Sequence, residues 1–322
     1  MSCCYRFIVS FIIIVTINCF SLISPVHSLP STSFEITPDK FLQMGVKNIQ
    51  LGNYEQAIEN FTQAIELNTN FAIAYSNRCL VYLQLQAYHN AIADCTVALK
   101  KSPLNTEAYL NRGLAEYRLR NYQAAILDYN RAIELKPHDF RAYYNRGLAN
   151  AALNHHDSAI GDYNLALTQI SQKPSYRLGD IYNDRGLVNF ELYNVSAALL
   201  DFSKAIRLNS TDDKAYFNRG CVCAKSQDNW GALRDFSEVI KLNPDNGTAY
   251  VNRGVAYHNL GYEQAAIKDL QTAAAYFVSR GERIAYHKTV KLIKTVQQQI
   301  SSRVEIATGE LGVRSWELGV RS

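Results

Sequence analysis

Small and apolar residues recur along most of this chain at helical spacing, in pairs of short segments. In residues 106–139 the first apolar stripe consists of Tyr109, Gly113 and Tyr117, and the second consists of Ala125, Tyr129 and Ala132. Intervals of three and four residues place each set on one face of a helix. Asn121 and Tyr122 stand between the segments, and Lys136 and Pro137 end the second. The pattern predicts a helical hairpin.

The same pattern returns with a nearly fixed period, marked by the phrase Tyr-x-Asn-Arg-Gly and close variants of it. Its arginines are separated by 34, 34, 39, 34 and 34 residues and stand at Arg78, Arg112, Arg146, Arg185, Arg219 and Arg253. A period of this length indicates one supersecondary unit stacked many times. The units span residues 38–71, 72–105, 106–139, 140–178, 179–212, 213–246 and 247–280.

These units resemble the tetratricopeptide repeat (TPR). Counted from the first residue of each unit, the family favours an aromatic residue at position 4, Gly at 8, Ala at 20, an aromatic residue at 24 and Ala at 27. Here position 20 is Ala in all seven units, and position 8 is Gly except at Cys79. Small residues at these positions let helices approach closely. The resemblance implies an all-α fold, a right-handed α-solenoid of seven hairpins followed by a C-terminal capping helix.

The N-terminus has the composition of a signal peptide. After Arg6 the chain is apolar from Phe7 to Ile23, and Val26 to Ser28 offer permitted residues before a cleavage site. We therefore expect residues 1–28 to be a signal peptide. An uncleaved N-terminal anchor remains the alternative, because about 17 apolar residues can just cross a bilayer. Lipidation at Cys19 is less favoured, since Asn18 is a poor preceding residue. Each alternative places the repeats outside the cytosol, in the periplasm, a lumen or the extracellular space.

Two further segments depart from the repeat. The 39-residue step adds five residues around Lys173 and Pro174, which we expect to extend the fourth unit's second helix or to form a loop, without a domain boundary. Residues 281–303 continue at helical spacing and would cap the array. Residues 304–322 contain a short phrase, Glu-Leu-Gly-Val-Arg-Ser, that occurs twice, and we expect them to be a disordered tail.

Arginine at position 7 accompanies aspartate at position 23 in six units. The aspartates are Asp94, Asp128, Asp162, Asp201, Asp235 and Asp269. In the first unit Met44 and Asn60 stand at these positions, so both charges are missing together. This joint loss predicts an ion pair inside each hairpin, with a structural role.

No constellation for chemistry emerges from the sequence. There is no glycine-rich phosphate loop or nucleophile elbow, and the acidic residues recur as repeat features. We therefore predict no catalytic residues, no cofactor and no metal site, and His155 and His156 lack a third ligand. Cys79 and Cys95 face each other across the second hairpin, where buried thiols are favoured over a disulfide. The net charge of +4 is spread over mixed signs without a basic stripe, so we predict no nucleic-acid partner.

In the family the first helices of the hairpins line a concave groove. The residues at position 6 form a row of amides: Asn77, Asn111, Asn145, Asn218 and Asn252. Beside them runs an apolar strip: Leu80, Leu114, Leu148, Leu187, Tyr117, Tyr144 and Phe217. An amide donates and accepts hydrogen bonds, so the row could bind an extended peptide backbone. The row is similar to the one in the repeats of O-linked N-acetylglucosamine transferases. The alternative is that the asparagines bond within the array.

These patterns predict a non-catalytic scaffold that binds an extended segment of a protein or peptide in the concave groove. The alternative is an assembly factor that docks folded subunits through its convex surface. An enzyme would need a site that the sequence does not show. The family's groove for a C-terminal carboxylate is disfavoured, because no unit combines Lys at position 5 with Asn at position 9. A membrane partner follows only if the N-terminal segment is retained.

Overall fold

The computed structural model describes the backbone of residues 37–170 and 176–319, and helices are the only regular elements among these residues. The described residues form two compact units, one on each side of the gap. None of the helices in these ranges is both long and apolar enough to cross a bilayer. The predicted signal segment, residues 1–28, lies outside the described ranges.

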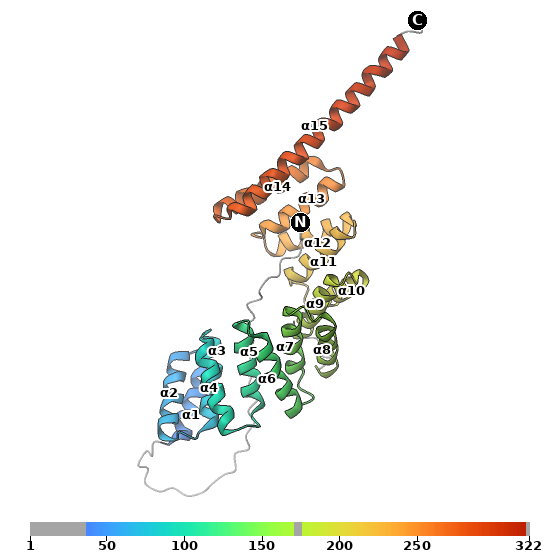
Figure 1. The fold of residues 1–322 in the computed structure, drawn as a ribbon. Helices are drawn as coiled ribbons and strands as arrows, with labels where there is room; N and C mark the ends of the chain where they lie inside the picture. Colours follow the sequence, from blue (N-terminus) through green and yellow to red (C-terminus); the bar gives the residue numbers. More distant parts are fainter. Residues whose placement is uncertain (1–36, 171–175, 320–322) are drawn as a thin grey trace. The chain divides into compact units, whose positions relative to one another are not determined.

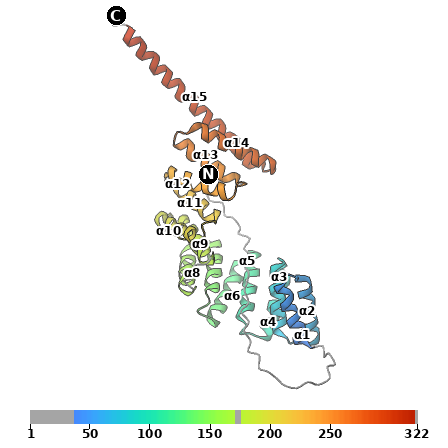
Figure 2. The same ribbon diagram turned by 180° about the vertical axis from the view of Figure 1, so that it is seen from behind.

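The N-terminal unit consists of four helical hairpins (Figures 1 and 2). They are α1 (Pro38–Gln50) with α2 (Tyr54–Leu67), α3 (Ala72–Gln84) with α4 (Tyr88–Lys101), α5 (Thr106–Arg118) with α6 (Tyr122–Leu135), and α7 (Phe140–Ala152) with α8 (His156–Gln169). The first helices contact one another in sequence, α1 with α3, α3 with α5 and α5 with α7. The unit is therefore a stack, as the repeat predicted.

The C-terminal unit contains three hairpins and one long helix. The hairpins are α9 (Tyr176–Glu191) with α10 (Val195–Leu208), α11 (Asp213–Lys225) with α12 (Asn229–Leu242), and α13 (Gly247–Asn259) with α14 (Glu263–Ser279). The final helix, α15 (Arg283–Gly319), packs against α14. Val296 is almost fully buried in this contact region, so α15 covers the end of the stack as a cap should.

The helices begin and end where the chain chemistry requires it. Asn105, Asp139 and Asp212 accept a backbone N–H of the first helix that follows each of them, which satisfies one of the unpaired donors at its N-terminus. The turn inside every hairpin needs one residue with positive φ, at position 15. These residues are Gly52, Gln86, Arg120, Asn154, Tyr193, Gln227 and Gly261. Five of them are not glycine, so hairpin packing overrides a local preference.

Five hairpins close by placing the glycine of the first helix against an aromatic ring of the second, and in the seventh Gly254 lies against Leu270 instead. Gly113 lies against the buried Tyr129, and Gly147 lies against the buried Tyr163 in the same way. A Cβ on Gly113 would be 2.7 Å from the Tyr129 ring. Glycine is therefore required by space at this position, since both helices are fixed by their other contacts.

The second hairpin solves the same packing problem with a disulfide, contrary to our expectation of buried thiols. Cys79 and Cys95 occupy the glycine and aromatic positions, their Cα atoms are 5.5 Å apart, and their sulfur atoms are bonded. Both residues are fully buried. Because the other hairpins bring these two positions into contact, the backbone already places two cysteines at bonding separation.

The 39-residue step also differs from what we expected. α8 ends at Gln169 and has 14 residues, as do α4 and α6, so the second helix of the fourth unit is not extended. Some of the added residues instead lengthen the next first helix, α9, which begins at Tyr176. The chain divides into its two compact units here, whereas we expected no boundary.

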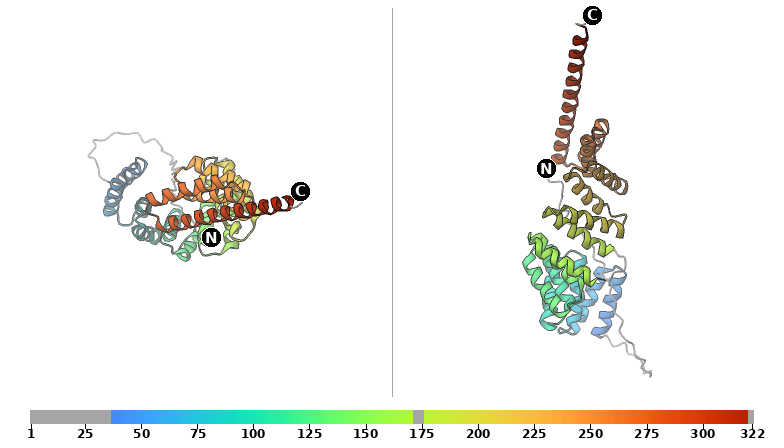
Figure 3. Two further views of the ribbon diagram at one scale, coloured as in Figure 1. Left: turned by 90° about the horizontal axis from the view of Figure 1, so that it is seen from above. Right: turned by 90° about the vertical axis from the view of Figure 1, so that its right-hand side faces the viewer.

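The end of the chain is the third difference. We expected a helix over residues 281–303 and a disordered tail over 304–322, but α15 continues to Gly319. In the right-hand view of Figure 3 its C-terminal half extends past the hairpins of its own unit. The segment after Arg303 has no proline, and its Glu, Leu and Arg residues favour helix. The local propensity of these residues outweighed the glycines from which we predicted disorder.

Replacing Gly113 by alanine should lower the free energy of unfolding by about 1–3 kcal/mol, because the new methyl group overpacks against Tyr129. The measurement is a chemical denaturation curve of the purified chain. Gly161→Ala is the matched control, because Gly161 lies inside α8 with open space around it. This control should raise stability by about 0.5–1 kcal/mol through helix propensity. Equal effects of the two substitutions would contradict the packing argument.

Candidate partner-binding surface

The arginine of each repeat phrase binds the aspartate of the same hairpin through two hydrogen bonds. In the fifth unit, for example, Arg185 Nε donates to Asp201 Oδ2 at 2.9 Å and Nη2 donates to Oδ1 at 2.6 Å. The structure shows the predicted pair in all six units: Arg78–Asp94, Arg112–Asp128, Arg146–Asp162, Arg185–Asp201, Arg219–Asp235 and Arg253–Asp269. The two-point geometry suits a guanidinium and fixes the angle between the two helices.

The same arginine also reaches back to the preceding hairpin, which the sequence interpretation missed. Arg112 Nη1 donates to Thr96 Oγ1 at 3.1 Å, and Arg146 Nη1 donates to Asn130 Oδ1 at 2.6 Å. Further contacts of this kind join Arg78 to Thr62, Arg219 to Ser203 and Arg253 to Ser237. The acceptors stand at position 25, which carries Thr, Asn or Ser in the first six units and Gln271 in the seventh. Gln271 is the sequence signal for this contact, because the seventh unit is the only one not followed by a unit with arginine at position 7.

The tyrosine of the phrase supports the arginine from the other side. The guanidinium carbon of Arg185 lies 5.5 Å from the ring centre of Tyr182, and that of Arg112 lies 5.8 Å from the ring of Tyr109. Cation–π attraction of this kind strengthens as water is excluded. Hydrogen bonds to Asp128 raise the pKa of the Arg112 guanidinium, so the arginine stays charged, while burial raises the pKa of the Asp128 carboxyl. The Tyr, Arg and Gly of the phrase are therefore structural.

The asparagines of the phrase have a different environment. Asn77 and Asn111 are half-buried on consecutive first helices, and their side chains have no hydrogen-bond partner among the described residues. Asn145 and Asn218 are buried, and Asn218 Nδ2 donates to Asn183 Oδ1 at 3.0 Å. The Nδ2 atom of Asn252 is buried without a partner in the described part of the chain. Bonding within the array therefore accounts for Asn218 but not for the other amides.

Only some residues of the predicted apolar strip are exposed enough to contact a partner. Leu114, Leu148, Leu187, Tyr117 and Tyr144 are half-buried on the first helices. Two members differ from our expectation because they pack inward. Leu80 is buried, and Phe217 is buried with its ring 5.7 Å from that of Phe236, so both belong to the core. Helical position alone does not separate a groove residue from one that seals the gap between adjacent hairpins.

One carboxyl group on the first-helix side of the C-terminal unit has a shifted pKa. Burial and the nearby carboxylates of Asp184 and Asp212 raise the pKa of Asp180 to about 7. Desolvation and like charges both disfavour the ionised form. The charge of this part of α9 therefore changes near neutral pH.

The described residues contain no group of three or more side chains that could hold a metal ion. The two cysteines of α11 form no disulfide and are buried, and burial raises the pKa of the Cys223 thiol to about 11. A thiol with so high a pKa is a poor nucleophile at neutral pH. His155 and His156 lie at the turn between α7 and α8, and they belong to no group of three potential metal ligands among the described residues.

Comparison with known families decides the classification. A tetratricopeptide repeat model matches residues 90–140, 110–174 and 217–277, and a TPR repeat model matches residues 48–86. The chain belongs to the tetratricopeptide repeat family. No curated protein sequence matches this chain.

Solved structures with the same fold include other TPR proteins. One, from Parabacteroides merdae, has a TM-score of 0.59 at 18% identity, over 79% of this chain and 98% of that chain. The Cut9–Hcn1 hetero-tetramer of APC/C also scores 0.59, at 16% identity, over 68% of this chain and 43% of that chain. YrrB, described as a TPR protein with an unusual peptide-binding site, scores 0.50 at 23% identity, over 61% and 97%. At these identities the likeness concerns the fold.

Replacing Arg146 by methionine should lower the free energy of unfolding by about 3–5 kcal/mol, because it leaves Asp162 buried without its partner. The Asp162 side chain is only 6% exposed and that of Arg146 is 23% exposed. Chemical denaturation measures the loss. The control is Arg131→Met, whose pair with Glu134 is 45% and 61% exposed. Such surface pairs contribute about 0.2–1 kcal/mol, so equally small losses from both variants would contradict a structural role.

Proposed function

We propose that this TPR chain is a non-catalytic scaffold that binds an extended segment of a partner protein across its first helices. The observation that carries the proposal is the amides of Asn77 and Asn111, which lie on consecutive first helices without a partner in the described array. Polar groups that are half-buried and unsatisfied favour a ligand that completes their hydrogen bonds.

The chemistry of the surface indicates the kind of segment. An amide presents one acceptor and two donors, which match the N–H and C=O groups of an extended peptide backbone. Leu114 stands on the same helix as Asn111, three residues later, and offers an apolar contact for a side chain of the partner. Backbone recognition with few side-chain contacts would accept segments of varied sequence. YrrB, a TPR protein of the same fold, is described as having a peptide-binding site, which supports a peptide segment as the partner.

A second candidate is the docking of folded subunits on the second helices. Leu127 of α6 is 70% exposed and Leu200 of α10 is 53% exposed, although each lies on a helix whose other face is core. Single exposed leucines are common on protein surfaces, so this observation is the weaker of the two.

We also propose that the chain is exported, with cleavage after Ser28. The composition of residues 1–28 supports this, and so does the Cys79–Cys95 disulfide, since structural disulfides persist mainly in oxidising compartments. An uncleaved anchor remains the alternative.

Partner capture should depend on the first helices. The chain is immobilised and exposed to an extract of its native source, and captured proteins are quantified by mass spectrometry. The triple variant Asn77→Ala, Asn111→Ala, Leu114→Ala should capture at least about tenfold less, which corresponds to a loss of about 1.4 kcal/mol in binding. The matched control, Leu127→Ser on α6, should capture as the parent chain does. The reverse result would favour docking on the second helices, and melting curves verify that both variants fold.

Export predicts the number of free thiols. The purified chain is denatured without reductant, alkylated and weighed. Cleavage after Ser28 removes Cys3, Cys4 and Cys19, and the disulfide protects Cys79 and Cys95. The expected product therefore begins at Leu29 and carries two alkyl groups, on Cys221 and Cys223. Four labels would contradict the oxidised pair, and an intact Met1 would favour the anchor.

A further inference from the structure

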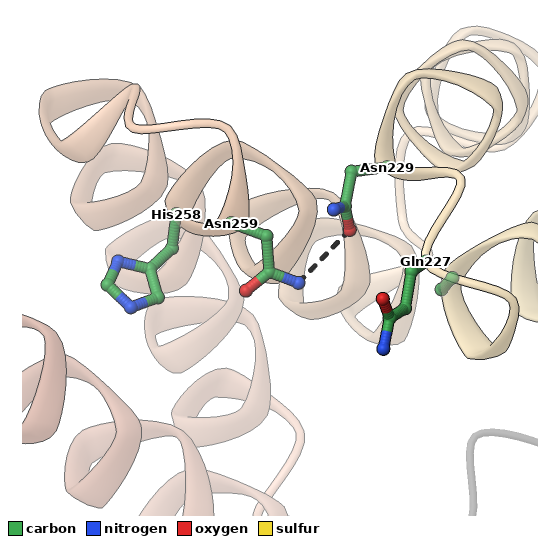
Figure 4. Close-up of a pocket in the computed structure, with 5 residues that line it drawn as sticks. Gln227, Asn229, His258 and Asn259 are labelled. Atoms are coloured by element: carbon green, nitrogen blue, oxygen red, sulfur yellow. Dashed lines mark hydrogen bonds between the residues drawn. The ribbon is translucent and has the colours of Figure 1, made fainter.

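A polar pocket opens where three helix ends meet in the C-terminal unit. It lies at the C-terminal ends of α11 and α13 and at the N-terminal end of α12 (Figure 4). Its volume is about 410 Å³, and it is lined by Ala224, Gln227, Asn229, His258 and Asn259. Volumes of this order accommodate a small molecule. The pocket is separate from the amides on which the proposed function rests.

At the pocket the sixth unit has small and polar residues at two positions that pack together in the second and third units. In the third unit the residues at positions 12 and 17 are Tyr117 and Tyr122, whose rings lie 5.4 Å apart. In the second unit Leu83 and Tyr88 join the same hydrophobic cluster. The sixth unit has Ala224 and Asn229 there, a small residue and a polar one. The space that Tyr88 and Tyr122 fill in the second and third units is therefore left to the pocket in the sixth.

The side chains around this opening are uncharged hydrogen-bonding groups. Asn259 Nδ2 donates to Asn229 Oδ1 at 3.1 Å, which leaves the Asn229 donor and the Asn259 acceptor available. The Gln227 amide stands at the same opening (Figure 4). His258 Nδ1 lies 2.6 Å from Glu263 Oε2, so the carboxylate orients the imidazole and its Nε2 atom remains free to bond. The five lining residues therefore offer both donors and acceptors and include no acid, lysine or arginine. The nearest acids along the chain are engaged, because Glu263 contacts His258 and Asp228 accepts the backbone N–H of Gly231.

Two exposed aromatic residues are close to the pocket in sequence, and neither is among its lining residues. Trp230 directly follows Asn229 and is 54% exposed, and Tyr262 directly precedes Glu263 and is 49% exposed. Their ring centres are 5.9 Å apart at a steep angle. Large rings are normally buried in a core, and two of them together at the ends of adjacent hairpins form an apolar platform.

We propose that this pocket binds a neutral saccharide of one or two sugar rings. Hydroxyl groups donate and accept, as the amides and the imidazole require, and a sugar's C–H face suits an aromatic ring. The absence of an unpaired charge among the lining residues disfavours phosphorylated or acidic sugars. The volume exceeds what a single amino-acid side chain fills, which favours a sugar over one residue of a peptide.

Saturation-transfer NMR of the full chain tests the proposal. The probes are N-acetylglucosamine, galactose, glucose and the disaccharides chitobiose, lactose and cellobiose, at millimolar concentration. At least one should receive saturation from the protein. The double variant Ala224→Leu, Asn229→Tyr restores residue types that other units carry at these positions, so it should fold and should abolish the transfer. Trp230→Ala should weaken binding about three- to tenfold.

A matched pair of variants separates the pocket from its surroundings. Gln227 and Gln86 stand at the same repeat position with φ of 64° and 60°, but only Gln227 lines the pocket. Gln227→Ala should weaken saccharide binding and Gln86→Ala should not. The proposal is overturned if no probe receives saturation from the folded chain, or if the double variant binds equally well. It is also overturned if a Gln-containing peptide competes for the pocket and no sugar does.

Discussion

The guanidinium at repeat position 7 holds the stack together. Each of these side chains donates two hydrogen bonds to an aspartate of its own hairpin, and five are seen to donate a third to the hairpin before it. A single planar group thus fixes both the angle inside a hairpin and the step between hairpins, and a tyrosine ring excludes water from one side. Where a polar network is fully satisfied in this way it specifies one arrangement.

Much of this architecture could be predicted from the sequence, because the repeated units can be aligned with one another. The joint loss of charge at Met44 and Asn60 predicted the Arg–Asp pairs, and the helix pairs follow from the spacing of small residues. The link from Arg112 to Thr96 was missed, because hydroxyl residues at position 25 resemble ordinary surface residues. The change to Gln271 at position 25 of the last unit could have revealed this link, because no arginine follows that unit.

The candidate site was less predictable for a physical reason. Leu80 and Leu148 occupy equivalent positions, yet one is buried and the other half-exposed, because exposure depends on how adjacent hairpins close. Likewise, spacing could not decide whether Cys79 and Cys95 are bonded, since a disulfide depends on distance and redox conditions. The five residues added at the 39-residue step also gave no sign of dividing the array, because the repeat resumes directly after them.

The bonded cysteines show that the contact between positions 8 and 24 accepts two unrelated chemistries. Gly113 and Tyr129 fill it by volume, and Cys79 and Cys95 fill it by a covalent bond, without changing the lengths of the helices around them. Either residue pair can therefore occupy this contact in a hairpin. A single unit of such an array can gain or lose a covalent brace through two substitutions, while its neighbours keep their packing.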